Sequence, residues 1–317
     1  MLTVWEKAAR KADLTLKLPG GIPMFFRRIP AGSFRMGARG EGADEEPMHQ
    51  VVVTREFLLG TFVVTQEQYR AVASRCPALK KQSDPSHFKG PRRPVEQISW
   101  HDATAFCQWL RCWRGLPKEI REVRLPDEAE WEYACRADSE TEYYNGDGEA
   151  ALANVAWFEK NSGNESHAVD ERPESHPFGL YGMHGNIWEW CLGVHDSNAY
   201  RKREDGWEAR EWVLSEKGKD RARVLRGGSW YDTARGCRSA YRDRLRPDVR
   251  YRNFGLRVCL VRGPAGPADN RAASAPGDGG RGTRLESDGA GGGPHGTPSG
   301  ASHVSPRSGS KKMNKAA

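Results

Sequence analysis

Long apolar runs are missing from this sequence of 317 residues, and their absence excludes a membrane-spanning helix. A bilayer helix needs about 18 or more consecutive apolar residues, and no stretch approaches that length. The charged segment 1–17 lacks the apolar core of a secretory signal, so we expect a cytoplasmic protein with no membrane partner. The seven cysteines are odd in number and scattered, which argues against a disulfide framework.

The spacings typical of common metal, nucleotide and hydrolase sites are absent as well. Neither Cys-x2-Cys nor His-Glu-x2-His occurs, so we expect no zinc site. There is no phosphate-binding Walker loop and no Gly-x-Ser-x-Gly nucleophile elbow. The net charge is +7 but falls to +4 without the last 55 residues, and no nucleic-acid-binding module accompanies it. We therefore expect no specific nucleic-acid partner.

Composition divides the chain into a part that can fold and a part that cannot. Residues 263–317 hold 13 of the 35 glycines and 6 of the 19 prolines, but only Leu285, Val304 and Met313 as large apolar residues. Such a segment cannot bury enough surface to offset its ordering entropy. The preceding residues hold all 11 Trp, which with the Tyr and Phe suffices for one core. We predict a lead-in at 1–21, one folded domain at 22–262 and a disordered, basic tail at 263–317.

Local patterns predict an α+β domain with short strands and few helices. Apolar runs bounded by turns predict strands near residues 25–26, 34–36, 51–53 and 57–59. Thr65, Ser99 and Asp127 each stand three residues before a Gln, Asp or Glu, which is the pattern of a capping box at a helix start. Beyond residue 137 the periodicity fades, so the second half of the domain is expected to be irregular.

Five phrases, in this order, resemble the formylglycine-generating enzyme (sulfatase-modifying factor) family. They are PVEQISWHDA (94–103), RLPDEAEWEYA (124–134), GLYGMHGNIWEW (179–190), RGGSW (226–230) and NFGLR (253–257). The resemblance spans roughly residues 24–262 and implies a single irregular domain related to the C-type lectin fold. It also implies an oxygen-dependent oxidoreductase that acts on a cysteine of a substrate protein. That activity uses copper(I) held between two thiolates, a match of soft metal and soft ligands.

The family's catalytic position has a different composition in this chain. The first thiolate of the family lies two residues after the aromatic of the Gly-Gly-Ser-aromatic phrase, and this chain has Asp232 there, a hard oxygen ligand. Counted forward from the Gly-Gly phrase, Cys237 stands at the position of the second thiolate. Counted back from Pro247-Asp248, it does not. With Ser229, these residues lie nearest the family's catalytic position. Because at most one soft ligand is present, we expect no copper(I), and whether the chain is an enzyme stays open.

The resemblance also implies that calcium is a possible cofactor. Transferred residue by residue, the calcium ligands are carbonyl oxygens of Gly185 and Ile187, the carboxylate of Glu189, and a second site that begins at Asn154 and Val155. Gly182 stands where relatives often have Asn or Asp, which removes one side-chain ligand. Two interpretations stay open for Glu189: a calcium ligand, or a buried structural acid held by hydrogen bonds.

The segment 231–254 suggests binding without catalysis, because aromatic side chains interleave with arginines there, and both anchor contacts well. The predicted ligand-binding face consists of Trp230, Tyr231, Asp243, Leu245, Val249, Tyr251 and Phe254. The segment resembles the variable region of lectin-fold proteins that are diversified by retroelements. Alternatively, its arginines are structural, and we expect this of at least two among Arg238, Arg242 and Arg257.

Three functions therefore stay open. The first is an oxidoreductase of the family acting on protein cysteine, against which the missing thiolate argues. The second is a noncatalytic ligand- or protein-binding domain, and the third is an accessory component of a multi-protein system. A protein or peptide is the expected ligand.

Overall fold

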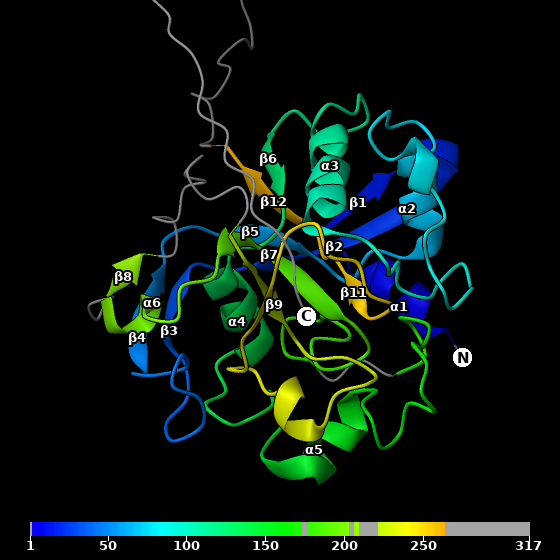
Figure 1. Ribbon diagram of the computed structural model, residues 1–317. Helices are drawn as coiled ribbons and strands as arrows, with labels where there is room; N and C mark the ends of the chain where they lie inside the picture. The colour runs from blue at the N-terminus through cyan, green and yellow to red at the C-terminus, as the bar shows by residue number, and fades with distance from the viewer. Residues whose placement is uncertain (1, 173–175, 203–205, 209–220, 264–317) are drawn as a thin grey trace, which may run out of the picture. The chain divides into compact units, whose positions relative to one another are not determined.

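The computed structural model describes residues 2–172, 176–202, 206–208 and 221–263 (Figure 1). The chain divides into two units, residues 1–268 and 269–317, and the second unit lies outside the described residues. Apart from residue 263, the predicted tail also lies outside them, so its disorder stays a prediction.

Within the described residues, the strands form three sheets. The first is antiparallel, in the order β1 (Leu14–Lys17), β2 (Pro23–Ile29), β5 (Phe57–Gly60), β12 (Cys259–Arg262) and β6 (Ile120–Arg124). The second has the order β10 (Asp243–Leu245), β9 (Arg223–Arg226), β7 (Trp188–Val194) and β11 (Phe254–Gly255). The third has the order β3 (Gly32–Met36), β4 (His49–Val53) and β8 (Trp207–Glu208). The four predicted strands are confirmed as β2, β3, β4 and β5.

Helices are few and short, as the sequence predicts. They are α1 (Val4–Lys11), α2 (Gln66–Ala73), α3 (Trp100–Arg111), α4 (Glu128–Arg136), α5 (Gly148–Val155) and α6 (Ala199–Lys202), with 3-10 turns at Pro19–Gly21, Lys80–Gln82 and Ala234–Cys237. The predicted capping boxes at Thr65, Ser99 and Asp127 are confirmed, each with reciprocal bonds between the cap and the third helical residue. No helix in the described ranges is long and apolar enough to cross a membrane.

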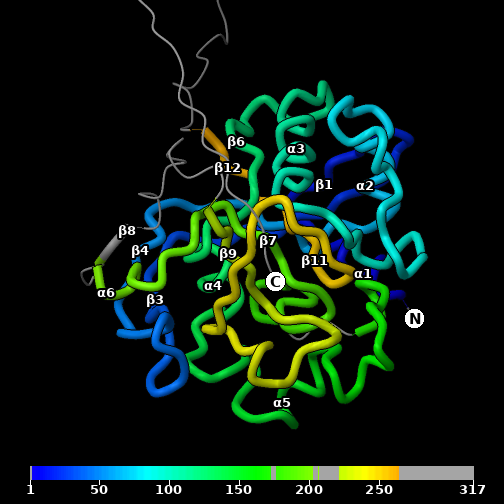
Figure 2. Tube along the Cα trace, viewed as in Figure 1, coloured from blue at the N-terminus to red at the C-terminus, as the bar shows by residue number. Residues whose placement is uncertain are grey.

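Helix α4 lies at the centre of the fold, and all of its residues are buried. It packs against β3, β7 and β9 (Figure 2). Its sequence alternates apolar side chains such as Trp131 with Glu128, Glu132 and Arg136. A helix buried on every side cannot leave such charges without partners, because burying an unpaired charge is costly. The segments packed on α4 must therefore bring charges of the opposite sign.

The N-terminal segment 1–21 contributes to the fold rather than only leading into it. Strand β1 extends the first sheet by pairing with β2. The Trp5 ring stacks on Phe62 and meets Phe25 edge-on, with ring centroids 5.2 and 5.1 Å apart. This segment therefore covers one side of the domain and belongs to the same compact unit.

Candidate functional site

A hollow of about 300 Å³ opens beside the second sheet, and we name it the aromatic hollow. Its lining residues are Trp188, Trp230, Tyr231, Asp232, Asp243, Tyr251, Arg252, Asn253 and Phe254. Six of these belong to the residues that the sequence predicts for catalysis or for ligand binding. The hollow is thus lined by one predicted catalytic residue, Asp232, and by five residues of the predicted binding face.

Two features of the backbone place the aromatic walls of the hollow. The two-residue strand β11 pairs in parallel with β7, which sets Phe254 beside Trp188. Ahead of Trp230, Gly227 and Gly228 adopt φ of 97° and 72°, a region that favours glycine. A Cβ on Gly228 would lie 2.6 Å from the Cys237 sulfur, so only glycine fits at this turn. The Gly-Gly-Ser-aromatic phrase therefore encodes a tight turn that delivers Trp230.

A chain of hydrogen bonds fixes the floor of the hollow. The Ser229 hydroxyl donates to the Asp232 carboxylate and accepts from the Asn253 side-chain amide at 3.0 Å. The backbone N–H of Tyr231 also donates to the Ser229 oxygen, at 3.3 Å. Burial raises the pKa of the Asp232 carboxyl, a change that the bond from Ser229 opposes. Two of the three predicted catalytic residues thus form one hydrogen-bonded unit.

Two tyrosines at the rim of the hollow are unusually accessible. The residues Tyr231 and Tyr251 are 64% and 54% exposed, more than any other large apolar residue that the structure describes. The Trp230 ring beneath them is buried and meets the Tyr231 ring edge-on at 5.4 Å. The Arg252 guanidinium lies over the Trp230 ring, 5.3 Å from its centroid. The hollow therefore combines exposed rings with a firmly packed base.

Cys237, the third predicted catalytic residue, is fully buried behind the hollow. Its sulfur lies 4.0 Å from the carbonyl oxygen of Ser229, and all seven cysteines are free thiols. Burial, and then the nearby charge of Asp232, raise the pKa of the Cys237 thiol. A copper(I) site needs accessible thiolates. One buried thiol and one hydrogen-bonded carboxylate do not fit that ion.

Two members of the predicted binding face do not line the hollow. Leu245 and Val249 pack against the main hydrophobic cluster instead of lining the hollow. Conversely, sequence reasoning missed Trp188, Arg252 and Asn253 as lining residues. Trp188 reaches the hollow only through the β7–β11 pairing, which joins segments far apart in the chain. Arg252 and Asn253 adjoin Tyr251 directly, so proximity in sequence was an available signal for them.

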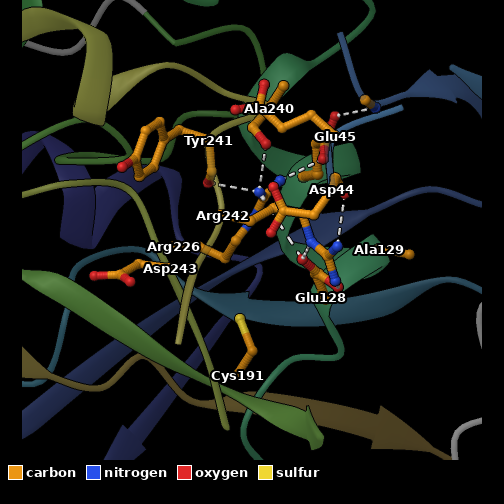
Figure 3. Close-up of polar contacts among 12 residues, drawn as sticks. Asp44, Glu45, Glu128, Ala129, Cys191, Arg226, Ala240, Tyr241, Arg242 and Asp243 are labelled. Carbon is orange, nitrogen blue, oxygen red and sulfur yellow. Dashed lines mark hydrogen bonds and ion pairs between the residues drawn. The ribbon is translucent and has the colours of Figure 1, made fainter. Parts of the chain in front are cut away.

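A set of charged residues on and around α4 forms what we name the buried ion-pair cluster. Figure 3 shows Glu128, Arg226 and Arg242 of this cluster together with Asp243, which lines the hollow. Its members are Glu128, Glu132 and Arg136 of α4, Arg226 of β9, and Arg242. Arg226 donates to Glu132 and to the carbonyl oxygens of Ser239, Ala240 and Tyr241. The Arg242 guanidinium bonds both oxygens of Glu128, at 2.6 and 2.9 Å. Each α4 member of the cluster therefore has a partner of opposite charge: Glu128 pairs with Arg242, and Glu132 pairs with Arg226 and Arg136.

Two more arginines tie the segment 231–254 to distant parts of the domain. The Arg238 guanidinium bonds both oxygens of Glu45, at 3.0 and 2.9 Å. Arg250 bonds both oxygens of Asp102, the residue that completes the capping box of α3. With the contacts of Arg242 and Arg257, these bonds confirm that the arginines named in the sequence analysis are structural.

The Glu189 carboxylate is saturated by protein donors. Arg257 donates to both of its oxygens, at 2.7 to 3.1 Å, and the Trp131 indole N–H donates to one at 2.8 Å. A carboxylate offers about four lone-pair sites, and four contacts occupy them. Arg257 also bonds the Gly182 carbonyl oxygen, at 3.3 Å. These residues match the structural-acid interpretation of Glu189 and do not fit a calcium ion.

The second set of predicted calcium ligands begins in α5. The Asn154 amide donates to the Ala150 carbonyl within α5, at 3.1 Å. Val155 lines a small hollow together with Gly185, Ile187 and Arg172. The Arg172 guanidinium stacks 3.9 Å above the Trp157 ring and donates to the Ala153 carbonyl. In the described part of the chain, no group of three or more His, Cys, Asp or Glu could hold a metal ion.

Comparisons with known proteins place this geometry in a family. The model of the "Sulfatase-modifying factor enzyme 1-like domain" matches residues 26–262. The inactive C-alpha-formylglycine-generating enzyme 2 of Bos taurus is 30% identical over 301 residues, which cover 76% of this chain and 90% of that protein. A chaperone protein, LppX of Paenibacillus barcinonensis, is 24% identical and covers 65% of this chain and 81% of that one.

Among solved structures, Treponema denticola variable protein 1 superposes with a TM-score of 0.64 at 26% identity, covering 78% of this chain and 98% of that one. The fold is the mixed α+β, C-type-lectin-like fold that the resemblance implied. The chain belongs to the sulfatase-modifying factor family, the family of the formylglycine-generating enzymes.

Proposed function

We propose that this chain is a noncatalytic member of its family that binds an exposed segment of a partner protein in the aromatic hollow. The observation that carries the proposal is the hollow itself. It includes Asp232 at the family's catalytic position, yet its lining consists of aromatic rings, two carboxylates, Arg252 and Asn253, with no thiol. The predicted catalytic cysteine, Cys237, is fully buried, with its sulfur 4.0 Å from the Ser229 carbonyl oxygen.

The shape and composition of the hollow suit a binding site. Tyrosine, tryptophan and arginine dominate the residues that contribute most to protein–protein affinity, and all three line this hollow. Its volume is that of a small ligand pocket, large enough for one or two side chains of a partner. The two exposed tyrosine rings lose contact with water when a partner covers them, which favours association.

The chemistry of the site argues against oxidation of cysteine by the copper route. That reaction needs two thiolates to hold copper(I), whereas this site offers one thiol whose burial raises its pKa. The likeness to a relative named as inactive and to another named as a chaperone is in keeping with binding rather than catalysis. A role as accessory component of a multi-protein system would use the same hollow.

Binding is tested with a displayed library of short random peptides, selected on the purified full chain. The peptides that emerge are titrated against Tyr231→Ala and Tyr251→Ala. We expect each substitution to weaken binding about tenfold or more, as at interface positions of high energy. Leu2→Ala is the matched control, because Leu2 is also exposed but lies outside the hollow. Failure to select any peptide, or equal loss in all three variants, would contradict the proposal.

Catalysis is tested separately by incubating the full chain with copper(I), oxygen and a cysteine-containing peptide. We expect no bound stoichiometric copper(I) and no aldehyde product. Turnover that disappears in Cys237→Ser would show that the chain is an oxidoreductase after all.

A further inference from the structure

The aromatic hollow contains two carboxylates that lack a cationic partner. Asp232 accepts from the Ser229 hydroxyl and from the Trp188 side chain, and Asp243 accepts from the backbone N–H of Arg244 at 2.7 Å. The Arg244 guanidinium turns instead toward Asp44, 3.6 Å away. Among the ion pairs between described residues, which reach to 4.0 Å, none includes Asp232 or Asp243. Arg252 also lines the hollow, but its guanidinium lies over the Trp230 ring and forms no ion pair with either carboxylate. Two carboxylates and one guanidinium leave the hollow with a net negative charge.

The two carboxylates interact unfavourably when both are ionised. Burial raises the pKa of both carboxyls, and the charge of Asp243 raises the pKa of Asp232 further. Two carboxylates that face one space repel each other, so their ionised forms are stabilised by a cation placed between them. A neutral side chain in the same place would remove water from the carboxylates without forming a compensating ion pair or hydrogen bond.

The walls of the hollow suit a cation as well. Ammonium and guanidinium groups are attracted to the faces of aromatic rings. The Trp230 ring already carries one guanidinium, that of Arg252, at 5.3 Å. The tyrosine rings at the rim offer apolar surface to an aliphatic stem whose charged end reaches deeper. Rings and carboxylates therefore favour the same class of side chain.

We propose that the hollow receives a lysine or arginine side chain of the partner protein. The charged group lies between Asp232 and Asp243, and its stem packs against Tyr231 and Tyr251. This inference rests on the proposed function, because it names the part of the partner that enters the hollow. It goes further by assigning the chemistry of that part.

The experiment uses four displayed peptide libraries, each random except for a fixed central Lys, Arg, Leu or Glu. All four are selected in parallel on the full chain. We expect the Lys and Arg libraries to yield binders, and the balance between them to show which cation is preferred. Replacing the fixed cation by Leu in a selected peptide should weaken binding about tenfold or more.

Substitutions in the chain test whether Asp232 and Asp243 are the residues that bind the cationic side chain. Asp243→Asn and Asp232→Asn should each weaken binding of the cationic peptides about tenfold, while Asp248→Asn should not. Asp248 is a matched control, since it is an exposed carboxylate of the same segment that pairs with Arg246 outside the hollow. If the Leu library yielded as many binders as the Lys and Arg libraries, and Tyr251→Ala weakened their binding, the preference for a cationic side chain would be refuted. The proposed function would then still stand. Binders from no library would overturn both.

Discussion

The buried ion-pair cluster and the aromatic hollow share one stretch of chain but treat charge in opposite ways. In the cluster, Arg226 and Arg242 are buried and bonded to Glu132 and Glu128. In the hollow, Asp243 stands only one residue after Arg242 and has no cation within 4.0 Å among the described residues. Figure 3 shows Asp243 lying apart from the ion pairs of its neighbour.

The difference separates charge that holds the fold from charge that is available to a partner. An unpaired charge is tolerated where solvent or a ligand can reach it, and not where it is fully enclosed. Helix α4 is enclosed on all sides, so its acids must be matched inside the domain. The hollow opens outward, so its acids can be matched by another molecule. The predictions below test this contrast.

The largest effect is expected from Arg226→Met, which leaves Glu132 buried opposite Arg136 alone. Breaking one partner out of a buried pair costs about 3–5 kcal/mol of unfolding free energy. Urea denaturation measures the loss, with Arg246→Ala as the exposed control, for which about 0–1 kcal/mol is expected. The double variant Arg226→Met/Glu132→Leu should recover much of the stability, because it removes the stranded charge. If Arg226→Met were as stable as Arg246→Ala, the contrast between the buried ion-pair cluster and the aromatic hollow would be wrong.

Acid should lower the free energy of unfolding of the domain through two buried histidines, His184 and His176. The buried His184 ring contacts the Cys237 carbonyl at 2.8 Å and the Tyr144 N–H at 3.2 Å, which together require the neutral ring. Burial lowers the pKa of His184 from 6.5 to about 3 and that of His176 to about 4. The unfolded chain therefore binds these protons first, and stability present above pH 6.5 is lost as the pH falls.

The expected slope is about 1.4 kcal/mol per pH unit for each histidine between pH 6.5 and 4. Denaturation at a series of pH values measures it. His184→Gln should lower stability at neutral pH and flatten the slope. A profile that does not change between wild type and this variant would show that the ring is not held neutral.

A smaller pH effect is expected at Asp243 in the hollow, and its sign is opposite to that of the histidines. Burial raises the pKa of the Asp243 carboxyl, while Arg244 and His195 oppose this and Asp44 adds to it. A raised folded-state pKa means that stability is lost as the pH rises through it. Asp243→Asn should therefore be slightly more stable than wild type at neutral pH, with the gain shrinking toward pH 3.8. A loss of stability at neutral pH would indicate that Asp243 has a structural partner.

The smallest expected effect is that of calcium. Because Arg257 and Trp131 saturate the Glu189 carboxylate, millimolar calcium or a chelator should leave the melting temperature unchanged. Glu189→Gln should lower the melting temperature by the same amount with and without calcium. A rise with calcium that this variant abolishes would restore the metal site.

The sequence predicted those parts of the fold that depend on neighbouring residues. Strands β2 to β5 follow from apolar runs between turns, and the capping boxes at Thr65, Ser99 and Asp127 follow from a spacing of three residues. Helix α5 was missed, because Ala150 stands three residues after its cap Asp147, so the sequence has no capping-box pattern there, and the Asp147 side chain makes no capping bond to the helix. The cytoplasmic location and the tail remain predictions.

The candidate site was predicted only in part, since it depends on pairing between distant segments. Phe254, Trp230 and the two tyrosines were recognised by residue type. Leu245 and Val249 do not line the hollow, because residue type alone gives no sign of which way an apolar side chain faces. Trp188 was missed because only the parallel pairing with β11 brings it to the hollow.

Three anchored arginines have a consequence for how this domain can change. Arg238, Arg242 and Arg250 fasten the segment 231–254 to Glu45, Glu128 and Asp102, each through two hydrogen bonds. Tyr231 and Tyr251 lie just outside the two ends of this anchored stretch, and their side chains are largely exposed. New specificities could thus be grafted or evolved at those positions while the scaffold keeps its course.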